Sequence, residues 1–112
     1  MSTPHLTRKL VLEGRVNAAD GAGGFTESWA VRGTLWAEVK AGTGRDVPGE
    51  EITLASVGYR ITVRGAAQGA PSRPKPDQRL RDGARLFRIL AVTETDATGQ
   101  FLTCFAREEG PT

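Results

Sequence analysis

The stretch ADGAGGFTESWAVRGTLWAEVKAGTGRD, residues 19–46, is the most informative part of the sequence. A glycine-rich turn leads into a segment that holds two tryptophans seven residues apart, Trp29 and Trp36, and a second polar, glycine-rich segment follows. Between the two turns we expect one long strand at about residues 29–40. Gly33 lies inside it, and a glycine inside a strand is typical of a bend or a bulge.

The side chains of this strand alternate, which indicates an antiparallel strand with one buried face. Leu35, Ala37 and Val39 point one way, and Trp36 and its polar neighbours point the other way. Trp29 and Trp36 fall on opposite faces of an ideal strand, but a bulge at Gly33 would bring them to the same face. Either tryptophan could fill the core, and we favour Trp36 as the partly exposed one that is available to a partner.

The rest of the chain has the same punctuation, because 14 glycines and 6 prolines separate short apolar segments. YRITVR (59–64) alternates most clearly, with Tyr59, Ile61 and Val63 inward. We expect further strands at about residues 10–16, on both sides of an Asp82-Gly83 hairpin turn, and in QFLTCFAR (100–107). Six short antiparallel strands must avoid exposed sheet edges, so we predict an all-β fold, a small antiparallel β-barrel with a long loop at residues 41–58.

Three finer expectations concern the second half of the chain. GAAQGAPSRPKPD (65–77) resembles a mobile connector that contributes little to the core. The strand around LFRILAV (86–92) has apolar residues on both faces, with Phe87, Ile89 and Ala91 on one face, which indicates a central strand covered on both sides. Phe101 and Phe105 are expected to point inward together with Phe87. Leu86, Leu90 and Val92 form the second apolar face of that strand.

Length and composition indicate one globular domain over residues 1–112, with residues 1–8 and 108–112 flexible. The chain is 38% hydrophobic and 25% charged, with a net charge of +2, so charge alone does not declare a nucleic-acid binder. It has no apolar run long enough to span a bilayer and no secretory signal, so we expect a soluble protein made in the cytoplasm without a membrane partner. The single cysteine, Cys104, lies in an apolar run and is expected to be a buried thiol.

The sequence offers little catalytic chemistry, so we expect no enzyme, no cofactor and no metal site. His5 is the single histidine and lies near the N-terminus, far from Cys104, which excludes a triad and a zinc site of the usual ligand count. The pairs Glu50-Glu51 and Glu108-Glu109 fall in polar segments where carboxylates are solvated and unperturbed. The glycines of GAGG lack the lysine of a phosphate-binding loop and form a turn.

Basic residues gather in the second half of the sequence. Arg79 and Arg81 are expected to project from one strand face, and Arg85 and Arg88 from the neighbouring strand. Such a stripe could contact phosphates of DNA or an acidic partner. The alternative is an ordinary solvated surface.

The order of these motifs resembles a known family. GGFTESWAVRGTLWAEV, a polar loop, YRITVR, DGARLFRILAV and FLTCFAREE follow one another over about residues 6–109. In this order and spacing they are similar to the small head-tail joining proteins of tailed phages, the head-closure or stopper family. The glycine-rich composition also resembles the version carried by a gene transfer agent, a phage-like particle.

The resemblance implies a structural role in a virion or phage-like particle that is assembled in the host cytoplasm. Copies of the barrel would form a ring between the portal or adaptor side of the head and the tail terminator or tail tube, with double-stranded DNA passing through. The loop at residues 41–58 would project into this channel, close it, and swing aside at ejection. The residues concerned are Gly42, Gly44, Arg45, Asp46, Glu50, Glu51 and Gly58, with the glycines as hinges.

Two alternatives stay open at this point. The loop could be an ordinary variable surface loop, since such loops are common. The whole chain could instead be an OB-like barrel that binds single-stranded nucleic acid. The low aromatic content of 6% weakens this hypothesis, because such barrels stack bases on aromatic side chains. The sequence leaves the copy number of the ring, six or twelve, undecided.

Overall fold

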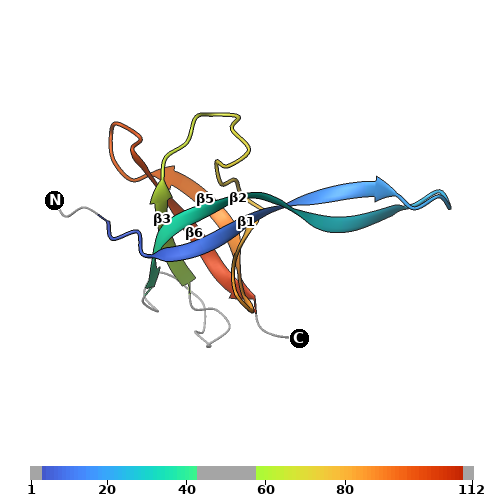
Figure 1. Ribbon diagram of the computed structural model, residues 1–112, viewed down its shortest axis with the longest axis horizontal. Helices are drawn as coiled ribbons and strands as arrows, with labels where there is room; N and C mark the ends of the chain where they lie inside the picture. The colour runs from blue at the N-terminus through green and yellow to red at the C-terminus, as the bar shows by residue number, and fades with distance from the viewer. Residues whose placement is uncertain (1–3, 43–57, 110–112) are drawn as a thin grey trace, which may run out of the picture.

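The computed structural model describes residues 4–42 and 58–109, and all of its regular structure in these ranges is β-strand. The expected all-β fold of six strands is therefore confirmed. The strands are β1 (Arg8–Ala19), β2 (Phe25–Ala41), β3 (Gly58–Arg64), β4 (Arg79–Asp82), β5 (Arg85–Glu94) and β6 (Phe101–Glu109) (Figure 1). No helix in this described part of the chain is long and apolar enough to cross a membrane.

The six strands form one sheet in which every neighbouring pair is antiparallel. Their order is β1-β2-β3-β6-β5-β4, and β4 returns to β1, where Leu12 pairs with Leu80. The sheet therefore closes on itself, which satisfies the backbone groups that an edge strand would leave unpaired. β4 and β5 are joined by a tight turn in which Gly83 has a φ of 62°, as expected after Asp82.

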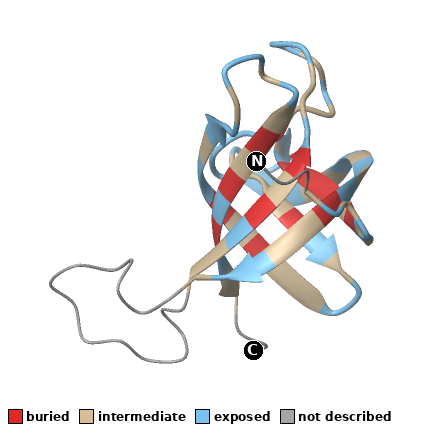
Figure 2. Cartoon of the chain, turned by 90° about the vertical axis from the view of Figure 1, so that its left-hand side faces the viewer, coloured by how far each residue is buried: buried red, intermediate tan, exposed pale blue. Residues whose placement is uncertain are grey.

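The core lies inside the closed sheet and is built from alternate residues of all six strands (Figure 2). Ile61 and Val63 are fully buried and Tyr59 packs beside them, as the alternation of YRITVR predicts. Cys104 is a buried free thiol, also as expected. The other fully buried large side chains are Leu10, Leu12, Pro74, Leu80, Phe87, Ile89 and Leu102.

A β-bulge in β2 confirms the irregularity expected at Gly33. Leu12 pairs with Gly33, but the next residue of β1, Glu13, pairs with Val31, so Arg32 is the extra residue. The bulge shifts the alternation by one. Trp29 and Trp36 therefore oppose Arg15 and Lys9, which are six residues apart and lie on one face of the β1–β2 ladder.

A second bulge makes the prediction for β5 wrong. The register shifts at Leu90, which is 53% exposed, so that Ala91 turns outward and Val92 packs against the core. The outer face of β5 is therefore exposed at Leu90 and Ala91. Phe105 also points outward, opposite Ala91, because Leu102 and Cys104 take the inward positions of β6. Phe101 shares this outer face, so the expectation of inward phenylalanines holds for Phe87 alone.

The expected connector, residues 65–77, is hydrogen-bonded to the sheet and contributes to the core, which the sequence did not lead us to expect. Pro74 is fully buried, and the Arg73 guanidinium donates a 2.6 Å hydrogen bond to the carbonyl of Ala66. The backbone amide of Asp77 donates to Ile89, and that of Ile89 donates to Gln78. A segment without apolar periodicity thus still supplies one core residue and a hydrogen-bonded cover.

The chain ends that the structure describes are also held. The backbone amide of His5 donates to the Glu38 carboxylate at 2.9 Å, which lowers the pKa of Glu38. At the other end, Glu108 and Glu109 belong to β6 and form ion pairs with Arg85 and Arg88. These two carboxylates are therefore not the solvated tail that the sequence indicated.

One part of the molecule stands apart from the closed sheet. Apart from the pair of Val31 with Glu13 at the base, residues 14–31 pair only with one another, because β4 reaches β1 only at Val11–Glu13 and β3 reaches β2 only at residues 37–41. This distal part of the β1–β2 hairpin, here called the arm, extends away from the sheet as a two-stranded ribbon (Figure 1). It accounts for the elongated shape of 54 × 37 × 25 Å.

Candidate functional site

The stem of the expected channel loop lies at one end of the closed sheet. The amide of Gly42 donates a 2.6 Å hydrogen bond to the carbonyl of Gly58, which extends the β2–β3 ladder to the mouth of the loop. The two predicted hinge glycines are therefore in contact with each other. The remaining predicted loop residues, Gly44, Arg45, Asp46, Glu50 and Glu51, lie outside the described residues.

A cluster of polar and aromatic side chains braces the sheet beside this stem. The Arg85 guanidinium contacts both oxygens of Glu108, at 2.8 and 3.1 Å, and the Tyr59 hydroxyl donates to the same carboxylate. These contacts lower the pKa of Glu108, because Arg85 and then Tyr59 stabilise its charged form against the opposing effect of burial. Tyr59 in turn packs edge-on against Phe87, with ring centroids 5.1 Å apart. The start of β3 is thus fixed directly next to the loop.

Arg79 and Arg81 do project from one face of β4, but they converge on a single carboxylate. Glu13 of β1 is buried, and its side chain lies 2.6 Å from Arg79 Nε and 3.0 Å from Arg81 Nη2. A buried carboxylate is tolerated when charged hydrogen-bond donors surround it. Glu13 carries no signal of this role in the sequence, because its partners lie 66 and 68 residues away.

Trp29 lies at the base of the arm beneath three guanidinium groups. Arg79 lies 4.1 Å from the centre of the indole, and Arg15 and Arg88 each lie 5.4 Å from it. This geometry is that of cation–π stacking. The stack joins the base of the arm to β4 and β5, so Trp29 has a structural contact that its sequence position did not reveal.

All four arginines of the predicted basic stripe have carboxylate partners. Arg88 Nε lies 3.0 Å from Glu109, and Arg85 has the paired contact with Glu108 described above. Pairing reduces the net charge that these side chains present to a phosphate. The contact with DNA or a partner assigned to them stays a prediction, and the structure gives them a bracing role first.

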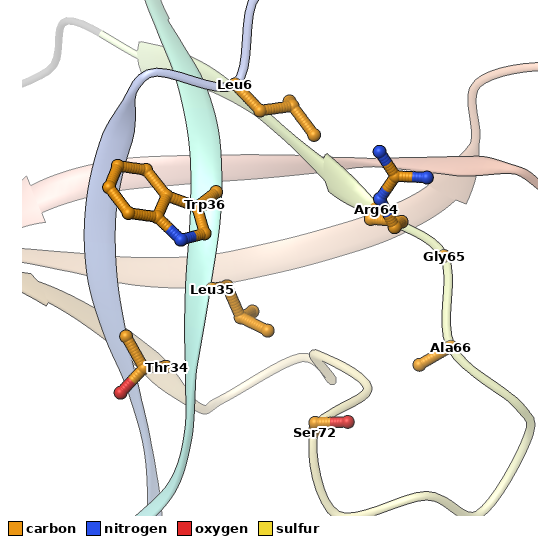
Figure 3. A pocket seen from close by; sticks show the side chains of 8 residues that line it. All are labelled: Leu6, Thr34, Leu35, Trp36, Arg64, Gly65, Ala66 and Ser72. Atoms are coloured by element: carbon orange, nitrogen blue, oxygen red, sulfur yellow. The ribbon is translucent and has the colours of Figure 1, made fainter.

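Trp36 borders a pocket at the other end of the closed sheet, away from the loop stem. The indole is 55% exposed, as expected for a residue available to a partner. The pocket has a volume of about 650 Å³ and opens between β2, the end of β3 and the connector (Figure 3). Its walls are Leu6, Thr34, Leu35, Trp36, Arg64, Gly65, Ala66 and Ser72.

Gly65 fixes the shape of this pocket. Its amide donates a 2.7 Å hydrogen bond to the carbonyl of Gln100, and a Cβ at this position would lie 2.2 Å from the carbonyl oxygen of Gly99. The close approach of two backbones requires glycine here. The Arg64 guanidinium lies 5.9 Å from the centre of the Phe101 ring. Arg64 is the one charged residue in a pocket wall that is otherwise mostly apolar.

The side chains on these surfaces are suited to contacts with other molecules. Across residues 4–42 and 58–109, no group of three or more histidine, cysteine or carboxylate side chains could hold a metal ion. Burial raises the pKa of the Cys104 thiol to about 12, so it stays neutral and is a poor nucleophile. The candidate surfaces are therefore the arm, the pocket around Trp36 and the end that carries the loop.

Comparison with solved structures places this architecture among known proteins. The chain is similar over 98% of its length to a chain of the virion of a native gene transfer agent (GTA) particle, which is covered completely, at 55% identity and a TM-score of 0.79. It is also similar over its full length to all of protein SF1141 from Shigella flexneri 2a, at 20% identity and a TM-score of 0.75. The second likeness shows the fold alone.

No curated protein matches the chain, whereas a family model matches almost all of it. Residues 1–109 match the model of the phage head completion proteins, the class of structural protein that the order of sequence motifs indicated. The chain therefore belongs to the phage head completion protein family, a structural family and not one of enzymes.

Proposed function

We propose that this chain is the head-closing subunit of a phage-like particle, where its copies form a ring between the head adaptor and the tail. The observation that carries the proposal is the end-to-end match, at 55% identity, to a chain of a GTA virion. The barrel shape of the subunit suits this role, because a closed sheet presents loops at its ends and sides without edges that would pair at random.

The loop at residues 41–58 is the part that closes the DNA channel in this proposal. Its stem supports the assignment, because the hydrogen bond between Gly42 and Gly58 holds the two ends of the loop together at a braced end of the sheet. Loops that leave every subunit from the same place can converge on one point in a ring. Rotation about Gly42, Gly44 and Gly58 would then open the channel without disturbing the strands.

Native mass spectrometry of the purified chain, alone and mixed with candidate portal, adaptor and tail proteins of the same particle, tests the ring. We expect a closed complex of several copies in the presence of its neighbours in the particle. A chain that stays monomeric with all of them present would overturn the proposal.

Particles with an altered loop test the closure separately. Replacing residues 43–57 with a short Gly-Ser linker leaves the Gly42–Gly58 stem intact, so rings should form while packaged DNA leaks from the heads. A Gly-Ser loop of the original length is the matched control, which separates the role of loop length from that of the charges on Arg45, Asp46, Glu50 and Glu51. Full retention of DNA by the short loop would exclude channel closure by this segment.

Nucleic-acid binding through the outer face of β3 and β6 is a second candidate that one observation favours. Phe105 is exposed opposite Arg60, and Phe101 lies beneath Arg64, so aromatic and basic side chains alternate across this ladder. Such interleaving suits base stacking with phosphate contact. Oligonucleotide binding by the isolated chain that weakens steeply with salt and is lost on Phe105→Ser would favour this candidate over the ring.

A further inference from the structure

The arm is built for contact with something outside its own chain. A two-stranded ribbon is at best marginally stable in water, and none of the described strands β3 to β6 pairs with residues 14–31. The arm also carries Phe25 at its tip, 77% exposed, and Val31 near its base, 66% exposed. Exposed aromatic side chains on a projecting element are typical of an interaction surface.

The turn at the tip has a defined shape and a negative charge. The Asp20 carboxylate accepts hydrogen bonds from the amides of Ala22 and Gly24, at 2.8 and 3.0 Å, and Gly21 and Gly23 adopt the positive φ angles that the turn requires. These amides lower the pKa of Asp20, which keeps it ionised. Phe25 follows this turn directly, so the tip carries both an exposed aromatic ring and a carboxylate.

The pocket around Trp36 has the complementary properties. Leu6, Leu35 and Ala66 provide apolar walls, and Arg64 provides a positive charge. A volume of about 650 Å³ is large enough for a phenylalanine side chain together with part of the turn that carries it. An aromatic ring with a neighbouring carboxylate fits an apolar pocket with a neighbouring guanidinium in both shape and charge.

An arm cannot reach the pocket of its own chain. Trp36 pairs with Lys9, and the β1–β2 ladder continues from there, with one bulge at Arg32, to the pair Ala19 and Phe25. Ten residue steps of strand separate the tip from the pocket by roughly 33 Å. An arm tip that enters this pocket therefore belongs to another molecule, and a second copy of this chain carries such a tip.

We propose that the arm tip of one copy, with Phe25 and Asp20, docks into the Trp36–Arg64 pocket of the next copy. Because the two surfaces differ, this contact is head-to-tail, and such contacts repeat around a symmetry axis until the ring closes. The inference rests on the proposed function, since it supplies the contact between neighbouring subunits of the ring.

Disulfide crosslinking tests this contact directly. A chain that carries both Ala22→Cys at the tip and Ser72→Cys in the pocket should, once assembled with its particle neighbours and oxidised, yield a ladder of covalent oligomers up to the full ring. The native Cys104 is buried with a thiol pKa of about 12 and does not take part. The pair Ala22→Cys with Arg107→Cys, on the exposed end of β6, is the matched control and should stay uncrosslinked.

Substitutions in the two surfaces give a second measurement. Phe25→Ser and Arg64→Gln should each weaken assembly about ten-fold or more, as removal of a central contact does, and the double variant should be little worse than either. Asp20→Asn keeps an oxygen acceptor for the turn and removes the charge, so it should weaken assembly less. Val31→Ser, which removes an equally exposed apolar side chain at the other end of the arm, should assemble normally.

The outcomes separate this inference from the proposed function. A ring that forms with its usual partners but gives no crosslink between positions 22 and 72, and is unaffected by Phe25→Ser, would overturn the arm contact and leave the ring standing. A crosslinked ladder with the expected loss in both surface variants would support both. Failure of the unmodified chain to assemble with any partner would overturn both.

Discussion

The arm and the closed sheet share two strands, yet they are stabilised in different ways. In the closed sheet each strand pairs on both sides, and most of the inward side chains are fully buried. In the arm the same β1 and β2 pair only with each other, and Phe25 and Val31 lie in water. Cooperative stability therefore lies in the closed sheet, while the arm depends on the contacts at its base.

The largest effect should come from the core. Phe87→Ala removes a fully buried ring that packs on Tyr59, so it should lower the free energy of unfolding by about 3–5 kcal/mol. Phe25→Ala, at the arm tip, should change it by about 0.5 kcal/mol or less. Urea unfolding followed by far-UV circular dichroism measures both. Similar losses for the two variants would mean that the arm belongs to the cooperative core.

A backbone contact of the closed sheet should come next. Gly65→Ala places a methyl group 2.2 Å from a backbone oxygen of Gly99, so we expect a loss of about 3 kcal/mol in thermal or urea unfolding. Gly58→Ala is the matched control, because its nearest neighbour would lie at 3.9 Å, and it should cost about 1 kcal/mol or less. A harmless Gly65→Ala would show that the connector yields more easily than its contacts indicate.

The joint between the two regions should give a smaller, local effect. Glu13→Gln leaves Arg79 and Arg81 without their shared carboxylate. We expect the free energy of unfolding to fall by about 2 kcal/mol, and amide hydrogen exchange to accelerate more in the arm than in β3 and β6. Glu27→Gln breaks only the exposed pair with Arg15, at 3.5 Å, and should change little. Uniform exchange in both regions after Glu13→Gln would argue against a joint.

Acid should act on the closed sheet near the loop stem. The pKa of Glu108 is lowered in the folded chain, so its contribution to stability is present above the unfolded pKa of about 4.3 and is lost as pH falls through the lower folded value. Glu108→Gln should therefore be less stable than the native chain at pH 7, with the difference shrinking below pH of about 4. A constant difference from pH 7 to pH 2 would contradict the ion pair with Arg85, and Glu27→Gln serves as the control.

Much of the closed sheet could be predicted because alternation reports which face of a strand is buried. YRITVR placed Ile61 and Val63 correctly, and Gly33 marked a real bulge. No glycine in the sequence marks the bulge at Leu90, so the two apolar faces of β5 predicted a second covering layer, which the described residues do not form at Leu90 and Ala91. Pro74 was missed because burial of a single residue in a connector leaves no periodic pattern.

The candidate site was harder to predict than the fold, since its contacts join distant parts of the chain. Alternation showed that Arg79 and Arg81 share a face, but only the β1–β4 register brings Glu13 between them. The arm was likewise hidden, because residues 14–31 alternate as any strand pair does, and only the absence of further ladders on the described strands reveals that the ribbon projects. Trp36, by contrast, was placed by its polar neighbours.

The arm's ladder is separate from the ladders of the closed sheet, so the length of the arm can change while the closed sheet stays the same. Because residues 14–31 share no hydrogen bonds with β3 or β4, adding two residues to each strand of the arm lengthens it by about 7 Å and keeps every side chain on its face. The interior of the sheet is unchanged by such an insertion. The distance that one molecule can span is thereby adjustable in discrete steps, at positions that carry no part of the hydrophobic core.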